Sequence, residues 1–568
     1  MIKILPSLVF LIGYLQPGAQ IMSSPHLEKK GNAIQLIVQG KPFLVRGGEL
    51  HNSSTSTAEY MRGIWKKMAD KNLNTVITAV YWEMVEPIEG KFNFVLVDSM
   101  LAGARQQNLH LVLLWFGSWK NGYSTYPPTW VKKDFVKYPR AKDKNGKSFQ
   151  MLSTFGESSA KADAAAFGAL MQHIKEVDEH QQTVIAAQVE NEMGLFGSPR
   201  DYTDAASKAF AAPVPGDLMK YLSTHKNDIQ PEIDSAWKAN GYKTSGSWED
   251  VFGKSVFDKT NWKALSYLPE ELFTVYHYAK YVGTVAAEGK KAYAIPMYVN
   301  AWIKQDIFGY PGRYPSGGPI PHTMDVWRAV APALDFIAPD IYIKDALYTI
   351  LQYRRKGNPV FIPEFRPGLQ SASEALWAYG EAEAICFSPF GIDDIEAADD
   401  PITKTYAGIA QMQNLILQQH GRGTMHGIYM DTISKGQEFD LGGYRVTAQK
   451  TGGISTFAGF TIGSKSSPFA GGIVINSGKD EFVVIGKDFS LSFTPLQMDD
   501  STLDVEYLEE GHFVNDQWVM TRKLNGDEGT GGGDYGFGFG NPRKAALRFP
   551  VSPTGDYTIV KMKIYKYK

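Results

Sequence analysis

Eight apolar segments recur along the first 390 residues, and most of them follow a segment in which apolar residues have helical spacing. They cover residues 41–50, 74–82, 109–116, 183–190, 292–300, 334–343, 359–365 and 383–390. Near-continuous apolar strands that alternate with helices are typical of a parallel sheet whose outer face the helices cover. Because eight such units close a (β/α)8 barrel, the pattern predicts an α/β fold of the TIM-barrel type.

The pattern changes after about residue 423. Short segments with period-two alternation replace the helical spacing, and they predict a C-terminal antiparallel β-sandwich over residues 423–568. The barrel is then predicted over residues 23–422. Within it, an interval at about 196–268 is too long for an ordinary connection, and we interpret it as a mostly helical insertion beside the barrel mouth.

The first 22 residues have the features of a secretory signal peptide. One early lysine precedes the short apolar stretch Ile4–Leu15, and the small residues Gly18 and Ala19 follow it. Pro6 interrupts this stretch, and no later run reaches the roughly 18 apolar residues that a membrane span requires. The sequence therefore predicts a signal peptide over residues 1–22, a secreted or periplasmic protein, and no membrane span.

Composition narrows the range of partners. The 568-residue chain has a formal net charge of −2 and no basic block, so the electrostatic footprint of a nucleic-acid binder is missing. An aromatic content of 13% suits the stacking of rings on the apolar faces of sugars, although large cores also use aromatic residues. Cys386 is the only cysteine, which excludes an intramolecular disulfide.

No motif for a metal or a cofactor stands out. The 11 histidines include no H-E-x-x-H pattern, a single cysteine cannot form a thiolate cluster, and there is no G-x-S-x-G nucleophile elbow. We therefore expect chemistry that needs no metal and no cofactor.

Two glutamates lie at predicted strand ends. Glu192 follows the fourth predicted strand, and Glu364 lies at the end of the seventh. The C-terminal ends of the strands form the active site in barrels of this class. Two carboxyl groups there suit glycosidic bond cleavage, because one protonates the departing oxygen while the other attacks the anomeric carbon or activates water. Asn191, directly before Glu192, is well placed to bind a substrate hydroxyl.

Three motifs of the predicted barrel are distinctive, namely GGELHNSS, YWEMVEPIEGKFNF and QVENEMG. They resemble the first-strand segment, the Trp, Glu-Pro and Gly-x-Phe-x-Phe signature, and the acid/base motif of glycoside hydrolase family 35, the β-galactosidases. The resemblance spans about residues 40–420. The part after about Gly423 is similar to an extra β domain in one bacterial branch of the family, some members of which act on galactose side chains of plant polysaccharides such as xyloglucan.

The resemblance implies a retaining enzyme in which Glu192 is the general acid/base and Glu364 is the nucleophile. It also implies a role for Asn191 beside the scissile bond, and His51 stands where the family has a His. An alternative for His51 is a core histidine with satisfied hydrogen bonds.

The resemblance breaks at two positions that hold galactose hydroxyls in many family members. Ala79 replaces a Tyr, and Ser118 replaces a Glu. The neighbours that could take over their role are Tyr81, Glu83, Trp115 and Trp119.

Further candidates for substrate binding are Trp302, which follows the fifth predicted strand, and Tyr342, which lies at the end of the sixth. The tryptophans have an alternative role in barrel packing. Asp340 suits a structural role as well as a pocket role. Glu190 points to the opposite side from Asn191 under strand alternation, and we interpret it as structural.

These observations predict a retaining exo-glycosidase that hydrolyses terminal β-D-galactosyl residues of an oligosaccharide or polysaccharide. Two alternatives stay open. One is another β-glycosidase of the same clan, such as a glucosidase, mannosidase or glucosaminidase, and the other is a surface glycan-binding protein that has lost turnover. The C-terminal sandwich either packs against the barrel or is a carbohydrate-binding module. Nothing in the sequence specifies the oligomeric state.

Overall fold

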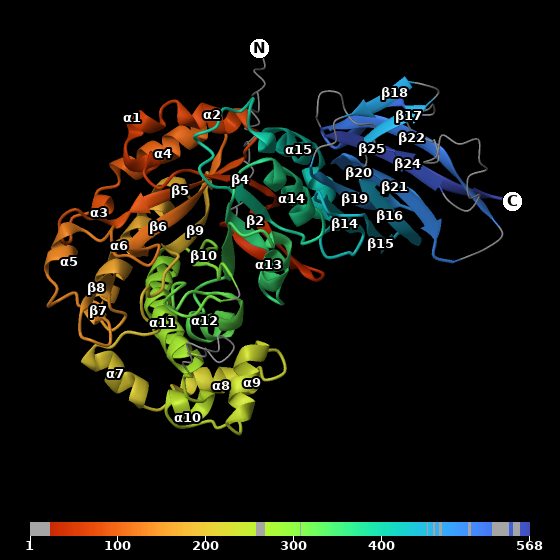
Figure 1. Ribbon diagram of the computed structural model, residues 1–568. Helices are drawn as coiled ribbons and strands as arrows, with labels where there is room; N and C mark the ends of the chain where they lie inside the picture. Colours follow the sequence, from red (N-terminus) through yellow and green to blue (C-terminus); the bar gives the residue numbers. More distant parts are fainter. Residues whose placement is uncertain are drawn as a thin grey trace, which may run out of the picture.

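The computed structural model describes residues 23–256, 267–306, 308–450, 453–457, 460–464, 468–497, 501–524, 545–548 and 557–568. The predicted signal peptide, residues 1–22, lies outside them. Figure 1 shows a barrel surrounded by helices, a group of short helices along its lower edge, and a C-terminal region of strands on its right.

Eight parallel strands form a closed barrel, which confirms the predicted fold class. In chain order they are β4 (Val45–Glu49), β5 (Thr75–Tyr81), β6 (His110–Lys120), β9 (Val184–Asn191), β10 (Met297–Trp302), β11 (Phe336–Ile341), β12 (Phe361–Phe365) and β13 (Cys386–Pro389). Each strand pairs with the next, and β13 pairs with β4. The segment 41–50, predicted as one strand, divides at Leu44, because β3 (Lys41–Phe43) belongs to a separate sheet.

Side chains that alternate along the strands fill the barrel interior. Ile77, Val112 and Phe336 belong to this buried cluster. A small antiparallel sheet of β1 (His26–Lys30), β2 (Ala33–Val38) and β3 adds Leu36 and Val38 to the same cluster. Because this sheet leads directly into the first residue of β4, it covers the N-terminal end of the barrel. The opposite end, where the strands finish, carries the glutamates.

Helices cover the outside of the barrel, and the longest of them, α6 and α11, pack against each other. The helices are α1 (Ala58–Met61), α2 (Ile64–Asp70), α3 (Trp82–Val85), α4 (Val95–Gln106), α5 (Thr129–Lys133), α6 (Glu157–Asp178), α11 (Leu268–Ala292), α12 (Met324–Val330), α13 (Ala346–Tyr353), α14 (Leu369–Gly380) and α15 (Pro401–Gln419), with short 3-10 helices at Ser54–Ser56 and Pro321–Thr323. None of the described helices combines the length and the apolar character that crossing a membrane requires.

Two insertions interrupt the alternation of barrel strands and helices. A hairpin of β7 (Arg140–Lys142) and β8 (Ser148–Leu152) lies between β6 and α6. Between β9 and α11, the described residues include four helices, which form the lower edge of the molecule in Figure 1. They are α7 (Asp204–Ala211), α8 (Gly216–Thr224), α9 (Pro231–Ala239) and α10 (Trp248–Phe252).

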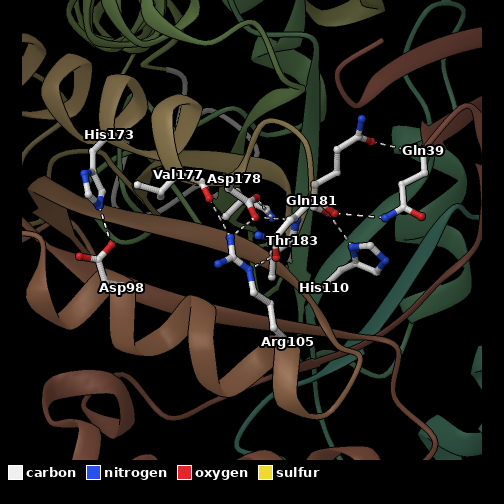
Figure 2. Close-up of polar contacts among 11 residues, drawn as sticks. Gln39, Asp98, Arg105, His110, His173, Val177, Asp178, Gln181 and Thr183 are labelled. Atoms are coloured by element: carbon white, nitrogen blue, oxygen red, sulfur yellow. Dashed lines mark hydrogen bonds and ion pairs between the residues drawn. The ribbon is translucent and has the colours of Figure 1, made fainter. Parts of the chain in front are cut away.

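A polar network fixes the beginning of β9 (Figure 2). Arg105 of α4 donates hydrogen bonds to the side chains of Thr183 at 2.9 Å and Asp178 at 2.7 Å. The carboxylate of Asp178, the last residue of α6, also accepts from the backbone N–H groups of Thr183 and Val184 at 3.0 and 2.7 Å. These bonds tie two helices to the N-terminal end of β9, the strand that ends next to Glu192.

The chain after α15 forms antiparallel sheets. One has the strand order β14-β19-β20-β25-β22-β23, another has the order β15-β16-β21-β24, and β17 pairs with β18. Their bounds are β14 (Met425–Met430), β15 (Gln437–Leu441), β16 (Tyr444–Lys450), β17 (Gly453–Phe457), β18 (Phe460–Ser464), β19 (Ala470–Gly478), β20 (Glu481–Lys487), β21 (Phe489–Pro495), β22 (Thr502–Val514), β23 (Gln517–Lys523), β24 (Ala545–Arg548) and β25 (Thr558–Tyr567). Val484 and Val560 of the six-stranded sheet share a buried cluster with Val446 and Phe493 of the four-stranded sheet, so these two sheets stack as a sandwich.

The strands β19 and β20 of the six-stranded sheet are buried on both faces. Ile473, Val483 and Ile485 belong to the cluster that includes the barrel helices, and not to the sandwich core. At Gly380 of α14, an added Cβ would lie 2.9 Å from the Cα of Gly427 in β14, so helix and strand are in direct backbone contact. The sandwich therefore packs tightly against the outside of the barrel at α14 and α15.

Candidate active site

The end of β9 has an unusual backbone. Glu190 and Glu192 have φ of +64° and +45°, in the left-handed region that residues other than glycine seldom adopt. The backbone N–H of Glu192 donates to Asn300 Oδ1 at 2.8 Å. The carboxyl group of Glu190 accepts from the backbone N–H groups of Ser118 and Trp119 in β6, at 3.1 and 2.7 Å. Strain of this kind persists only where surrounding contacts fix the backbone, and it clusters at functional sites.

Three carboxyl groups meet at the C-terminal ends of β9, β11 and β12. One oxygen atom from each of Glu192, Asp340 and Glu364 lies within 4.8 Å of the other two. Asp340 and Glu364 are register partners on adjacent strands, and Asn300 donates to Asp340 at 2.6 Å. The exposed fractions are 5%, 1% and 7%, respectively. The structure thus brings together the two glutamates that the sequence predicts as a catalytic pair.

A fourth carboxyl group and one ammonium group complete this cluster. Glu49, the last residue of β4, is 1% exposed, and burial together with the charges of Glu364 and Glu192 raises its pKa. Lys120, the last residue of β6, is 8% exposed, and its charge lowers the pKa of all three glutamates. Among the described residues, the three carboxylates of Glu192, Asp340 and Glu364 form the group that could hold a cation, but the positive charge of Lys120 opposes this.

Glu192 and Glu364 differ in the interactions that set their pKa values. Burial and the charge of Glu364 raise the pKa of Glu192 to about 8, against the opposing charge of Lys120, so Glu192 is protonated at neutral pH. Burial also raises the pKa of Glu364, but Lys120 and a hydrogen bond from Tyr342 favour its ionised form. The arrangement therefore supplies an acid at Glu192 and a carboxylate at Glu364.

Two predicted binding residues lie at this cluster. The hydroxyl of Tyr342 donates to Glu364 Oε1, and Tyr342 is 42% exposed. Asn191 is fully buried, and both polar atoms of its side chain lack a hydrogen-bond partner among the described residues. Since buried amide groups are almost always hydrogen-bonded, a ligand is the expected partner of Asn191.

Trp302 lies at the edge of the cluster as part of an aromatic rim, which we define as Tyr123, Phe196 and Trp302. Trp302 is the register partner of Asp340 and packs edge-on against Phe196, with ring centroids 5.5 Å apart. Phe196 stacks on Tyr123, which is 42% exposed, at 5.9 Å. Because Phe196 lies four residues after Glu192, the aromatic rim belongs to the acid side of the site.

The polar groups of three other predicted binding residues are already engaged by the protein. Tyr81 is 3% exposed, and its hydroxyl donates to the backbone oxygen of Asn52 at 2.6 Å. Glu83 forms an ion pair with Lys132 at 2.8 Å. The ring of His51 lies between two acids, 3.0 Å from Asp393 and 3.4 Å from Asp394. Each of the three is thus bonded to protein groups outside the cluster.

Trp115 and Trp119 pack among the helices and not in the pocket. Trp115 Nε1 donates to Asp163 of α6 at 2.8 Å, and Trp119 packs against Tyr278 and Tyr281 of α11 at 4.9 and 4.6 Å. Both indole rings are buried in the cluster that fills the space between the strands and the helices. Both tryptophans therefore contribute to the packing between the barrel strands and the helices.

A buried acid pair lies behind the strained end of β9. Glu190 and Asp163 are both fully buried, burial raises both pKa values, and the two groups share a hydrogen bond. Ser118 donates its hydroxyl to Asp163 at 2.5 Å and contacts the hydroxyl of Tyr281 at 2.7 Å. The carboxyl group of Glu190 is therefore bonded within the protein, and the hydroxyl of Ser118 is directed to Asp163 and Tyr281.

Sequence reasoning missed Glu49 and Lys120 and left Asp340 undecided. Glu49 ends the first barrel strand, and the rule that barrel strand ends carry function could have found it. Lys120 had no such signal, because β6 was predicted to end at Phe116 and continues to residue 120.

Two family models match the chain. A β-galactosidase model, glycoside hydrolase family 42, matches residues 52–265, and a domain of unknown function, DUF5597, matches residues 402–533. The β-galactosidase of Xanthomonas manihotis is 27% identical over 177 residues, which are 30% of this chain and 27% of that protein. The barrel of this chain is similar to β-galactosidases.

Two further relatives agree in name. Human β-galactosidase-1-like protein 3 is 29% identical over 225 residues, which are 35% of this chain and 32% of that protein. The solved β-galactosidase structure from Bacillus circulans sp. alkalophilus aligns with a TM-score of 0.45 and 15% identity, over 66% of this chain and 57% of that one. The chain spans about a third or less of the length of the curated relatives it matches. The matching family model is family 42, so the predicted family 35 is not confirmed.

The buried acid pair has a consequence for stability. Because the folded state keeps a proton that the unfolded chain releases above about pH 4.3, stability falls as the pH rises through that value toward the raised pKa of the pair. Glu190→Gln keeps an acceptor for Trp119 and donates to Asp163 without needing the proton. We expect this variant to match the wild type at pH 5 and to be more stable at pH 8.5, by on the order of 1 kcal/mol.

Thermal unfolding between pH 5 and pH 9 measures this difference. Glu190→Ala is the control, since it removes the bonds to β6 and should be less stable than the wild type throughout. Equal slopes of the unfolding temperature against pH in the wild type and Glu190→Gln would show that the pair holds no proton.

Proposed function

We propose that this protein is a retaining exo-glycosidase that hydrolyses terminal β-D-galactosyl residues. The observation that carries the proposal is the meeting of Glu192 and Glu364, from the fourth and seventh barrel strands, within 4.8 Å in a buried cluster. Retaining enzymes hold their two carboxyl groups about 5–5.5 Å apart, whereas inverting enzymes leave about 6.5–9.5 Å for a water molecule. The separation observed here supports retention.

The proposed reaction has two steps. The carboxylate of Glu364 attacks the anomeric carbon while Glu192 gives its proton to the departing oxygen, so the glycosidic bond breaks as the glycosyl-enzyme ester forms. Glu192, now ionised, then takes a proton from water. The resulting hydroxide attacks the same carbon, the ester bond to Glu364 breaks, and the sugar leaves with its β configuration.

Galactose is the proposed sugar because the matching family model and the relatives are β-galactosidases. We further propose, from the motifs of family 35, that the galactose is a side chain of a plant polysaccharide such as xyloglucan and that the protein is secreted or periplasmic. A panel of aryl β-galactosides, glucosides, mannosides and glucosaminides tests the sugar. Preference for a sugar other than galactose would make the protein another glycosidase, and binding without hydrolysis would make it a glycan-binding protein.

Glu364→Ala should lose activity on an aryl β-galactoside by about 10⁴-fold or more, because no group remains to form the ester. Azide or formate should enter the vacated space, restore part of the rate and give a product of inverted configuration. The matched control is Glu157→Ala on α6, whose side chain is 88% exposed and which should behave as the wild type. Absence of rescue, with the fold intact, would contradict the nucleophilic role.

The activity should fall above about pH 8. Glu192 works in its protonated form, so kcat/KM is lost as the pH rises through its pKa of about 8. In Glu192→Ala, this alkaline limb should disappear for a dinitrophenyl galactoside, whose leaving group needs no proton. A pH profile of kcat/KM measures it, and an unchanged alkaline limb in the variant would assign that pKa to another group.

The aromatic rim is proposed to hold the leaving group, because it lies on the side of the acid. Trp302→Ala should lower kcat/KM for a galactosyl disaccharide by about 10-fold, through loss of stacking worth about 1.4 kcal/mol. Galactosyl fluoride has no ring on its leaving group and should be hydrolysed equally well by both proteins. An equal loss on the two substrates would show that Trp302 acts on the barrel structure instead.

A further inference from the structure

We infer that Glu49 and Lys120 are sugar-binding residues that hydrogen-bond hydroxyl groups of the ring attacked by Glu364. This inference rests on the proposed function and deepens it, because it names two groups that select the sugar. Both residues have polar side-chain atoms at the cluster that lack a hydrogen-bond partner among the described residues.

Glu49 is in electrostatic contact with both catalytic glutamates but bonded to neither. Its residue is 1% exposed, and its Oε1 is buried without a hydrogen-bond partner among the described residues. Its position is well fixed, since β4 pairs with β5 at Ile77 and the backbone oxygen of Glu49 accepts from Ile392 at 3.2 Å. Leaving a buried polar group unpaired costs about 1–3 kcal/mol, so a fixed and unpaired carboxyl group indicates a ligand hydroxyl.

Lys120, whose charge is opposite to that of Glu49, also lacks a partner. Its ammonium group forms no ion pair or hydrogen bond with another described residue, and it lies 5.2 Å from the ring centroid of Phe116. Lys120 is nevertheless close enough to Glu49, Glu192 and Glu364 to lower their pKa values. An ammonium group that lies near acids without pairing to them leaves its donors for oxygen atoms of a ligand.

Two neighbouring positions offer no polar group to a sugar hydroxyl. Ala79 has only a methyl group in the barrel interior, and the hydroxyl of Ser118 is bonded to Asp163. Glu49 lies on the strand beside Ala79, and Lys120 lies two residues after Ser118. Glu49 and Lys120 therefore supply polar groups close to two positions that have none to offer.

The test compares each variant on a parent aryl β-galactoside and on its 2-, 3-, 4- and 6-deoxy analogues. We expect Glu49→Ala and Lys120→Met to lower kcat/KM on the parent by about 10- to 100-fold each. On the one analogue that lacks the hydroxyl bound by the altered residue, each variant should differ from the wild type by less than about threefold. Glu49→Gln retains a hydrogen-bonding group of the same length and should recover most of the loss.

The controls are Glu157→Ala and Lys161→Met, which remove an exposed acid and an exposed base from α6 and should leave every rate unchanged. If the losses are equal on all analogues, Glu49 and Lys120 touch no hydroxyl, and the inference is overturned while the proposed function stands. If the wild-type protein hydrolyses another glycoside, the same comparison applies to its deoxy series. If it hydrolyses none, the proposed function and the inference fail together. Should Glu49→Ala not fold, Lys120→Met and Glu49→Gln decide by the same criterion.

Discussion

Four buried carboxyl groups share the mouth of the barrel with a single ammonium group, and this crowding is the constraint on which the site depends. Like charges in a poorly solvated space repel strongly, so the groups cannot all ionise. The surroundings of these carboxyl groups differ, and the difference determines which of them ionises. Glu364 receives a hydrogen bond from Tyr342 and the field of Lys120, whereas Glu192 lies under the field of Glu364 and keeps its proton. The division into acid and carboxylate follows from this asymmetry.

The rest of the fold holds the crowded groups in place. Glu192 follows a strand anchored at its far end by Arg105 and Asp178, and at its near end by the bonds from Glu190 to β6. The N-terminal sheet fills one end of the barrel, and the six-stranded sheet of the sandwich packs against α14 and α15 on its outside. The acid pair formed by Glu190 and Asp163 behind β9 adds a second buried conflict, which fits the strained backbone found there. The crowded acids and the strained backbone thus lower stability at the site, and packing in the surrounding core compensates for this loss.

The sequence was sufficient to predict the barrel, the strands that carry Glu192 and Glu364, and the position of Tyr342, because apolar runs fix strand order and barrel closure fixes which ends meet. It could not predict which residues near the end of β6 face the mouth. From Trp115 to Lys120, β6 advances five residues while β9 advances two, so strand alternation is lost there. The sequence also could not predict that Glu49 and Lys120 lack partners, since this depends on distances between strands far apart in the chain. Comparison with the family motifs suggested Trp115 and Trp119 as replacement binding residues, but both rings pack against α6 and α11 instead.

The central claim is that Glu364 forms a covalent bond to the sugar at a site where Glu192 supplies the proton. Incubation with a 2-deoxy-2-fluoro-β-galactosyl fluoride, followed by mass spectrometry of the intact protein and of its peptides, tests this most directly. The account predicts one added fluorogalactosyl group, located on the peptide that contains Glu364. A label on a different residue, or the absence of any covalent adduct in a protein that hydrolyses β-galactosides, would contradict it.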